Sequence, residues 1–469
     1  MDRETRRKII LLFVLALALR LGMAIAAGPF TEPDSLTYDN LARNMVGGSG
    51  YADTRPYKIL DASMSVPPVY PSFLAAVYSV FGFHYGPVIA VQQVLGALLV
   101  VLAYFIGAGL FGARVGFWSA LVLAVHPWLI LLGSSLMTEA LFTFLFAGSM
   151  FFLVTGLSGG KTRYVVLAGF ILGLAILCRA SFQLYILLVP AVFGLTLKNI
   201  RSVVKHSLAF LIPALLLLSA WGFRNQRVHG FFGLTAVGGV NFLAGLNPPP
   251  SSYDDRDPVE KALREACDNP APQSIASVLP SAGLGRMVFK SGTVICSNLA
   301  VKALLDQGLT LPEIDRKFMT VALKQIRRAP PRYLKRCVSQ GISVWSGYQT
   351  EWLGGVFDKK FSENVRDHEY FVAAAKIVSR PLLGAVVLIL AALGVWAVFK
   401  KGPKSGWVPI STFVYLTAVC AAFNLGYVRY RMPLEPYIVM VCLYGLSFFG
   451  KRFSSLRGDQ APLLSRNPR

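Results

Sequence analysis

Long apolar stretches separated by short polar segments dominate the chain. A helix that spans a bilayer needs about 20 mostly apolar residues. Stretches of about this length lie at 9–27, 87–111, 115–132, 136–157, 164–179, 181–198, 206–222, 381–399, 407–425 and 433–450. The shorter apolar stretch 69–82 is expected to lie at the membrane surface or to be half-inserted. The pattern predicts an all-α polytopic membrane protein with roughly ten transmembrane helices.

The first apolar stretch follows a basic segment, Arg3 to Lys8, as a signal peptide would. Its length of about 19 residues exceeds the roughly 7–15 apolar residues of a signal peptide. We therefore interpret 9–27 as an uncleaved first helix.

Basic residues between the apolar stretches predict the orientation, because cytoplasmic loops are enriched in Lys and Arg. With a cytoplasmic N-terminus and ten spans, every short inner loop is basic and both termini are cytoplasmic. The inner loops then contain Arg114, Lys161, Arg163, Lys198, Arg201, Lys205, Lys400, Lys401, Lys404, Lys451, Arg452 and Arg457. We expect a multi-pass protein of the bacterial inner (plasma) membrane.

This orientation divides the chain into four parts. They are an N-terminal transmembrane module (1–222) that contains a first outer loop (28–86), an extracytoplasmic domain (223–380), C-terminal transmembrane helices (381–450) and a cytoplasmic tail (451–469). The extracytoplasmic domain is expected to be mostly helical, with helical patterns at 312–328 and 333–344 on either side of a Pro-Pro break. The tail is polar, and we expect it to be disordered.

Composition supports a membrane protein, since 54% of the residues are hydrophobic and 15% are charged, against about a quarter charged in soluble proteins. The net charge of +22 is explained by topology and anionic lipids, and no nucleic-acid motif is present. The net charge of +7 of region 223–380 suits anionic headgroups or a lipid phosphate, or is an ordinary basic surface. Six cysteines are too few for a disulfide framework, and both a Cys267–Cys296 bridge and free thiols remain open.

Two acidic residues are candidates for chemistry near the membrane. An ionisable group within a span is costly and indicates function. Glu139 lies at the outer end of its predicted helix, where it either serves function or pairs with an interfacial arginine. Asp34 follows a proline and precedes an amphipathic stretch. This position suits a helix N-cap, and it also suits a general base at the outer surface.

Arginines at the outer helix ends form the other half of the candidate site: Arg179, Arg224, Arg429 and Arg431. Arginine binds phosphate through two parallel hydrogen bonds. Singly, each of these residues is more often an interfacial anchor.

Six short motifs, in order, resemble those of the GT-C superfamily glycosyltransferases. In particular, the chain resembles bacterial family 39-type enzymes, which are related to protein O-mannosyltransferases and the lipid A aminoarabinose transferase. The resemblance extends to about residue 450. The motifs are Glu32-Pro-Asp34-Ser-Leu-Thr-Tyr38, Val66-Pro-Pro-Val-Tyr70-Pro71, His126-Pro127 with Met137-Thr-Glu139, Gly173 to Arg179, Arg224-Asn225 with Gly238 to Asn241, and Arg429 to Pro436.

The resemblance implies a GT-C-like helical bundle and an inverting transfer of a hexosyl or pentosyl group. The donor would be a polyprenyl-phosphate-linked sugar, and the acceptor a lipid, glycan or protein on the outer face. Asp34 would be the base, with Glu139 supporting substrate or acceptor. Arg179, Arg429, Arg431 and, as a weaker candidate, Arg224 would bind the lipid phosphate, and Tyr38 the donor.

The chain departs from the family at two positions. Ser35 replaces a second acidic residue, and Val66 replaces a lysine before the Pro-Pro pair. No cofactor is predicted: a divalent metal is compatible with the reaction, but these ligands do not support one.

Two other functions compete with an enzyme. A transporter or lipid flippase needs polar residues deep inside the spans and often an internal repeat, and the sequence shows neither. A non-catalytic scaffold for envelope assembly would have no activity that depends on Asp34.

Overall fold

The computed structural model describes residues 2–28, 33–55, 60–268, 292–346, 369–423 and 428–458. Within these ranges all regular elements are helices, which confirms the all-α fold class. Seven helices contain a segment long and apolar enough to cross a membrane. They are α1 (Arg3–Ala27), α5 (Tyr85–Phe111), α8 (Thr138–Gly159), α11 (Ile200–His229), α19 (Glu369–Lys401), α20 (Trp407–Phe423) and α22 (Glu435–Gly458).

Shorter apolar helices occupy the other predicted stretches: α4 (Val69–Phe81), α6 (Ala113–Ala124), α7 (Pro127–Leu132), α9 (Thr162–Cys178) and α10 (Tyr185–Thr196). The predicted single helix 115–132 is broken between α6 and α7, where Pro127 starts the new helix. A proline fits the first turn of a helix but not its interior. The predicted tail also begins as helix, because α22 continues to Gly458. Residues 459–469 lie outside the described ranges.

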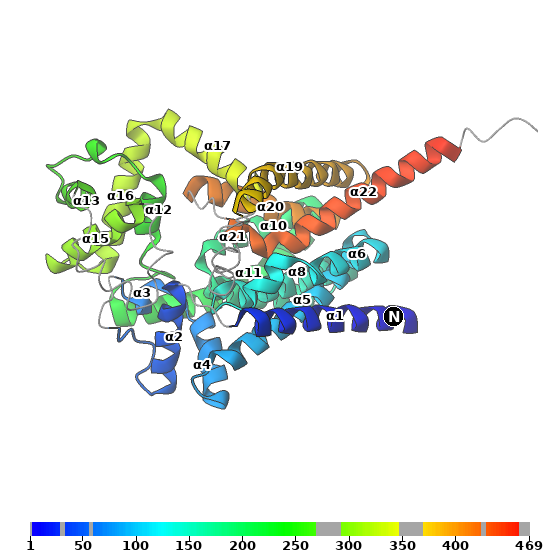
Figure 1. Ribbon diagram of the computed structural model, residues 1–469, viewed down its shortest axis with the longest axis horizontal. Helices are drawn as coiled ribbons and strands as arrows, with labels where there is room; N and C mark the ends of the chain where they lie inside the picture. Colours follow the sequence, from blue (N-terminus) through cyan, green and yellow to red (C-terminus); the bar gives the residue numbers. More distant parts are fainter. Residues whose placement is uncertain are drawn as a thin grey trace, which may run out of the picture.

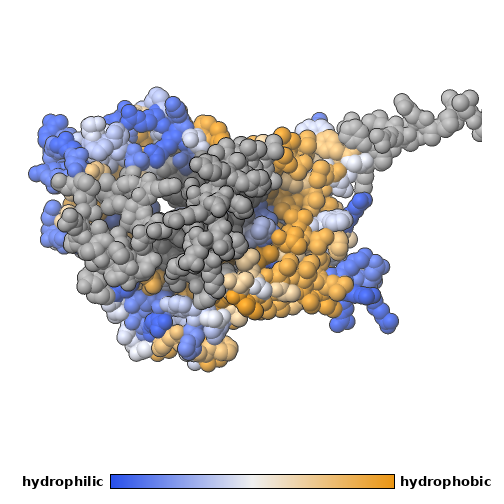
Figure 2. Space-filling view, viewed as in Figure 1, coloured by the Kyte–Doolittle hydropathy of each residue, from blue (hydrophilic) through white to orange (hydrophobic). Residues whose placement is uncertain are grey.

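The apolar helices form a bundle, and further helices gather at one end of it, where they form the part that we call the cap (Figure 1). The N-terminus and the last turns of α22 lie at one end of the bundle, and α12 (Gly238–Leu246), α13 (Pro258–Asp268), α15 (Gly292–Asp306) and α16 (Leu311–Arg328) lie at the other (Figure 1). Figure 2 shows an apolar band on the visible face of the bundle, with hydrophilic residues at both ends. The chain is therefore a multi-pass membrane protein whose described termini lie on the same side.

The cap has its own small hydrophobic core, separate from that of the bundle. Its α16 and α17 match the two helical patterns of the sequence, with the break at Ala329. The outer helices are α2 (Pro33–Val46), α3 (Ala62–Ser65), α12 (Gly238–Leu246), α13 (Pro258–Asp268), α15 (Gly292–Asp306), α16 (Leu311–Arg328) and α17 (Pro330–Ser346).

A close contact between α12 and α16 fixes the position of α12. The Asp315 carboxylate accepts a 3.0 Å hydrogen bond from the Val240 N–H in the first turn of α12. Burial raises the pKa of Asp315, although backbone N–H groups of α12 oppose the change. Gly239 allows the approach, because a Cβ there would lie 2.0 Å from the Asp315 carbonyl oxygen. The contact leaves Asn241 facing the cavity described below.

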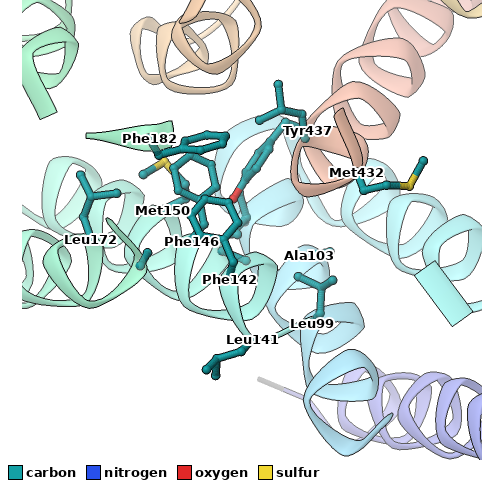
Figure 3. Packing of buried hydrophobic residues seen from close by; sticks show 14 of the residues in the cluster. Leu99, Ala103, Leu141, Phe142, Phe146, Met150, Leu172, Phe182, Met432 and Tyr437 are labelled. Carbon is teal, nitrogen blue, oxygen red and sulfur yellow. The ribbon is translucent and has the colours of Figure 1, made fainter. Parts of the chain in front are cut away.

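Aromatic side chains fill the bundle core beneath the candidate site. Figure 3 shows Phe142 and Phe146 of α8 converging with Phe182, which follows α9, and with Tyr437 of α22. Phe142 and Phe182 have ring centroids 4.6 Å apart. Phe142 lies one turn beyond Glu139 on α8, so this packing holds the outer end of α8 in place.

Arg20 corrects the expectation that the spans contain no deeply placed polar residue. Its side chain is fully buried in α1, and its two Nη atoms donate to the carbonyls of Ala16, Leu123 and Ala124. The last two belong to the end of α6, where helical carbonyls lack intrahelical donors. Gly96 makes room, since a Cβ there would lie 2.8 Å from Arg20 Nε. Arg20 thus caps α6 and ties it to α1.

Candidate active site

A cavity of about 630 Å³ lies between the membrane helices and the outer helices. Side chains from distant parts of the chain meet in it, and they are mostly polar and aromatic. The polar and aromatic lining residues include Asp34, Tyr38, Thr138, Arg179, Gln183, Asn241, Asn298, Arg336, Tyr415 and Tyr430. Its size is in the range of small-molecule sites.

The first-loop motif supplies one wall through α2. This helix begins at Pro33, so Asp34 lies inside the first turn and not at the N-cap, which corrects the capping interpretation. Proline pre-forms the first helical position and therefore starts the helix one residue earlier. The Asp34 side chain is exposed and lines the cavity. Tyr38, one turn further, packs edge-on against Tyr70 with ring centroids 5.1 Å apart.

Ser35, which stands where relatives carry a second acid, is buried beside α8. Its hydroxyl donates to Met137 Sδ over 3.7 Å, and Met137 is the N-cap of α8. The contact places the first-loop motif directly beside the second acidic motif. Among the described residues, His, Cys, Asp and Glu side chains form no group of three that could hold a metal ion.

Glu139 and Arg179 form a buried ion pair at the cavity wall. Arg179 Nη1 lies 2.8 Å from Glu139 Oε1, and the Glu139 side chain is fully buried. The same Nη1 lies 3.3 Å from the Thr138 hydroxyl. The Arg179 guanidinium also lies over the Tyr430 ring, 4.7 Å from its centroid. Arg179 therefore reaches the cavity, while Glu139 reaches it only through Arg179.

Of the two C-terminal arginines, Arg429 and Arg431, only Arg431 has a described side chain, and it does not lie at the cavity wall as Arg179 does. Arg429 lies in α21 (Val428–Arg431), and its side chain is outside the described residues. Arg431 is fully buried and does not line the cavity. Its Nε donates to Glu435 over 2.7 Å, and its Nη1 donates to the carbonyls of Val344 and Trp345 at 3.1 Å. Arg431 thus fastens the end of α17 to the start of α22.

Arg224 is an anchor for the first outer loop. Its two Nη atoms donate to the carbonyls of Ser63 and Tyr51 over 3.1 and 3.2 Å. The Tyr51 hydroxyl in turn donates to the Val66 carbonyl, just before the Pro-Pro pair, over 2.9 Å. Burial raises the pKa of Tyr51, which keeps this donor protonated. Pro67 then reaches the cavity lining.

Sequence reasoning missed Arg336, on α17, as a lining residue. The available signal was weak: Arg336 lies in a predicted helix among several basic residues, and no motif marks it. A possible Cys267–Cys296 bridge stays a prediction, because the Cys296 side chain is outside the described residues.

All six motifs meet at this end of the bundle. Besides the contacts above, the His126 ring lies 4.0 Å from Glu435, which joins the third motif to the last. The Gly238 to Asn241 segment lines the cavity from the outer side.

Comparison with a protein-family model matches residues 65–222 to the dolichyl-phosphate-mannose-protein mannosyltransferase family. This range is about a third of the chain and includes Glu139 and Arg179. Among curated proteins, none matches the chain at a significant level.

Solved structures show the fold. The chain is similar to the Archaeoglobus fulgidus oligosaccharyltransferase AglB in complex with an inhibitory peptide and a dolichol-phosphate, with a TM-score of 0.55 and 11% identity over 99% of this chain. The same enzyme tethered to an acceptor peptide matches with a TM-score of 0.52, at 12% identity over 100% of this chain. In both cases the chain spans about half of the matched protein, 52% of its length.

ArnT from Cupriavidus metallidurans bound to undecaprenyl phosphate is more distant, with a TM-score of 0.37 and 14% identity, covering 97% of this chain and 81% of ArnT. The family match and the shared fold confirm the resemblance predicted from the motifs: the chain resembles the dolichyl-phosphate-mannose-protein mannosyltransferases over residues 65–222 and shares the fold of AglB.

Proposed function

We propose that this protein is an inverting membrane glycosyltransferase. It transfers a sugar from a polyprenyl-phosphate-linked donor to a hydroxyl of a lipid, glycan or protein acceptor on the extracytoplasmic face. The observation that carries the proposal is the shared cavity, in which Asp34 and Tyr38 of the first-loop motif meet Arg179 of a separate motif.

The position of the cavity suits a lipid-linked donor. It lies where the membrane helices meet the outer helices, so an isoprenoid tail can stay in the bilayer while the sugar–phosphate bond enters the cavity. One AglB structure contains dolichol-phosphate, and the matching family is named for a dolichyl-phosphate sugar donor. Both support a polyprenyl-phosphate donor here. The end of the bundle that holds the cavity would face outward, with both termini cytoplasmic in a bacterial inner membrane.

The reaction is a single displacement. The acceptor oxygen attacks the anomeric carbon, the bond from that carbon to the phosphate oxygen breaks, and the polyprenyl phosphate leaves with the bonding pair. Asp34 accepts the acceptor's hydroxyl proton as general base. Attack from the face opposite the leaving phosphate inverts the anomeric centre.

The ion pair gives Glu139 and Arg179 different roles. Arg179 faces the cavity and stabilises negative charge that develops on the donor phosphate. Glu139 is fully buried and ion-paired with Arg179, so it positions that guanidinium. Arg431 and Arg224 act as positioning residues for α17 and the first outer loop, and not as phosphate ligands.

The test is transfer from radiolabelled polyprenyl-phosphate sugars in membranes that contain the wild type or Asp34→Asn. A small panel of sugars and a native envelope extract serve as donors and acceptor. Because a general base contributes about 10²- to 10⁴-fold, Asp34→Asn should reduce transfer at least a hundredfold at equal expression.

Asp61→Asn is the matched control. Asp61 lies in the same outer loop and caps α3 by accepting the Ser63 N–H over 2.9 Å, and Asn caps as well as Asp. This variant should transfer like the wild type. Near-normal transfer by Asp34→Asn would remove Asp34 from the mechanism. Activity that is lost equally in both variants would indicate damage to the loop.

A further inference from the structure

Arg336 lines the same cavity as Asp34 of the first-loop motif. It lies in the middle of α17, which runs from the outer helices to the membrane bundle (Figure 1). Its Nη1 donates to the Leu246 carbonyl at the end of α12. Its Nε is buried and has no hydrogen-bond partner among the described residues. One edge of the guanidinium is thus held by the protein, and the Nε–H on the other side awaits an acceptor.

A buried N–H group without an acceptor is unfavourable, by about 1–3 kcal/mol. Such a group needs an explanation, and at a cavity wall a ligand can supply the acceptor. The side edge of a guanidinium, Nε–H together with Nη2, binds two oxygens of a phosphate in parallel. The chemistry of this edge therefore favours a phosphate or carboxylate ligand.

The charges around the cavity distinguish Arg336 from the other arginines. Arg179 is ion-paired with Glu139, and Arg431 is ion-paired with Glu435 outside the lining. Within the described part of the chain, Arg336 forms no ion pair with a carboxylate and lines the cavity. Among the described lining residues, the charge of Arg179 is balanced by Glu139, whereas no described carboxylate balances the charge of Arg336.

We propose that Arg336 binds the phosphate of the polyprenyl-phosphate donor. Arg336 keeps this contact with the polyprenyl phosphate when it leaves the sugar. The proposal rests on the function proposed above and specifies the ligand of one residue in the same site. Arg179 then contacts the phosphate from the membrane side of the cavity, and Arg336 contacts it from the outer side. The two contacts orient the anomeric carbon toward Asp34.

The experiment measures binding and not transfer. Full-length protein in nanodiscs is titrated with undecaprenyl phosphate, the uncharged undecaprenol and inorganic phosphate, and complexes are counted by native mass spectrometry. Arg336→Gln should raise the Kd for undecaprenyl phosphate about 10- to 100-fold, because charged hydrogen bonds contribute about 1.5–3 kcal/mol. Undecaprenol should bind both proteins equally.

Two further variants make the result specific. Arg332→Gln removes an exposed arginine one turn earlier on α17, outside the cavity lining, and should bind like the wild type. Arg336→Lys keeps the charge but not the two-bond edge, and should give an intermediate Kd. If Arg336→Gln does not fold, Arg336→Lys serves as the test variant.

The outcomes separate this proposal from the proposed function. Equal affinity of wild type and Arg336→Gln for undecaprenyl phosphate overturns the assignment, even if the wild type transfers sugar. Loss of binding in Arg336→Gln supports it, even if no tested sugar is transferred. Binding of inorganic phosphate with the same dependence on Arg336 and no gain from the lipid tail would identify a free phosphate site, which overturns the lipid assignment.

Discussion

Two buried arginine–glutamate pairs lie at the outer end of the bundle, and they are alike in geometry. Arg179 and Glu139 are 2.8 Å apart, and Arg431 and Glu435 are 2.7 Å apart. All four side chains are nearly or fully buried. They differ in what the rest of the guanidinium contacts. Arg179 faces the cavity over Tyr430, whereas Arg431 donates to backbone carbonyls of α17.

The difference shows that burial and ion pairing alone do not identify a functional arginine. Both pairs carry the cost of removing charge from water, but Arg179 keeps 9% of its side chain exposed at the cavity, whereas Arg431 is fully buried. The pair at the cavity leaves one face of the arginine exposed to a ligand. The pair at the α17–α22 junction uses the arginine to join two helices. Function should therefore depend on the first pair, and stability on the second.

Removing Arg431 should have the largest effect on stability. Arg431→Met leaves Glu435 as a buried carboxylate without its cation, and breaking a buried pair in this way costs about 3–5 kcal/mol. Thermal unfolding of the purified protein in detergent should show a large loss of stability, and transfer should fall only with the folded fraction.

The double variant Arg431→Met/Glu435→Leu provides the control, because it removes both charges. It should recover part of the lost stability, since apolar replacement of a buried pair is often neutral. A single variant that unfolds like the wild type yet transfers no sugar would contradict the comparison and return Arg431 to the substrate site.

At the cavity pair, Glu139→Gln should impair catalysis more than folding. Gln keeps the size but removes the negative charge that lies 2.8 Å from Arg179 Nη1, so the guanidinium loses its counter-charge. We expect kcat/KM to fall about 10- to 100-fold with a small change in thermal stability. If transfer and stability decrease in proportion, Glu139 has the same structural role as Glu435.

Tyr430 offers a finer test of the cavity pair. The cation–π contact with Arg179 is worth about 0.5–2 kcal/mol. Tyr430→Leu should therefore lower kcat/KM about 2- to 30-fold, while Tyr430→Phe keeps the aromatic face and should stay closer to the wild type. Equal losses in both variants would assign the effect to the tyrosine hydroxyl and not to the ring.

The sequence predicted the helical segments and the motifs because both depend on local pattern. The apolar periodicity that defines α5 or α8 is contained in the stretch itself. The partner of an arginine is not, because it depends on which helix ends meet. Arg179 and Arg431 both look like outer-end arginines in sequence, yet the first meets Glu139 from a different helix and the second meets backbone carbonyls of α17.

The same limit explains why the sequence did not predict the roles of Arg336 and Arg20. Arg336 belongs to no motif, and only the packing of α17 against the bundle brings it to the cavity. Arg20 lies within an apolar stretch that reads as an ordinary span, and its function as a cap becomes visible only when the end of α6 lies beside it.

A third arginine–carboxylate pair, at the edge of the first outer loop, should give the smallest effect. Arg55 lies 2.8 Å from Asp53 and is partly exposed, so solvent screens the pair. Burial would raise the pKa of Asp53, but hydrogen bonds from Arg55 and the Ala62 N–H outweigh it and lower the pKa. Because the folded-state pKa is depressed, the stabilisation is present above the unfolded value of about 4 and is lost as pH falls through the folded value.

The pH dependence isolates this pair from the two in the bundle. Asp53→Asn should cost about 1 kcal/mol at pH 7. The difference in thermal stability between wild type and variant should stay constant above about pH 5 and shrink below about pH 4. A stability difference that does not change across this pH range would mean that the Asp53 charge contributes nothing. The loop would then be held only by the hydrogen bond that Asp53 accepts from the Ala62 N–H, which Asn can keep in part.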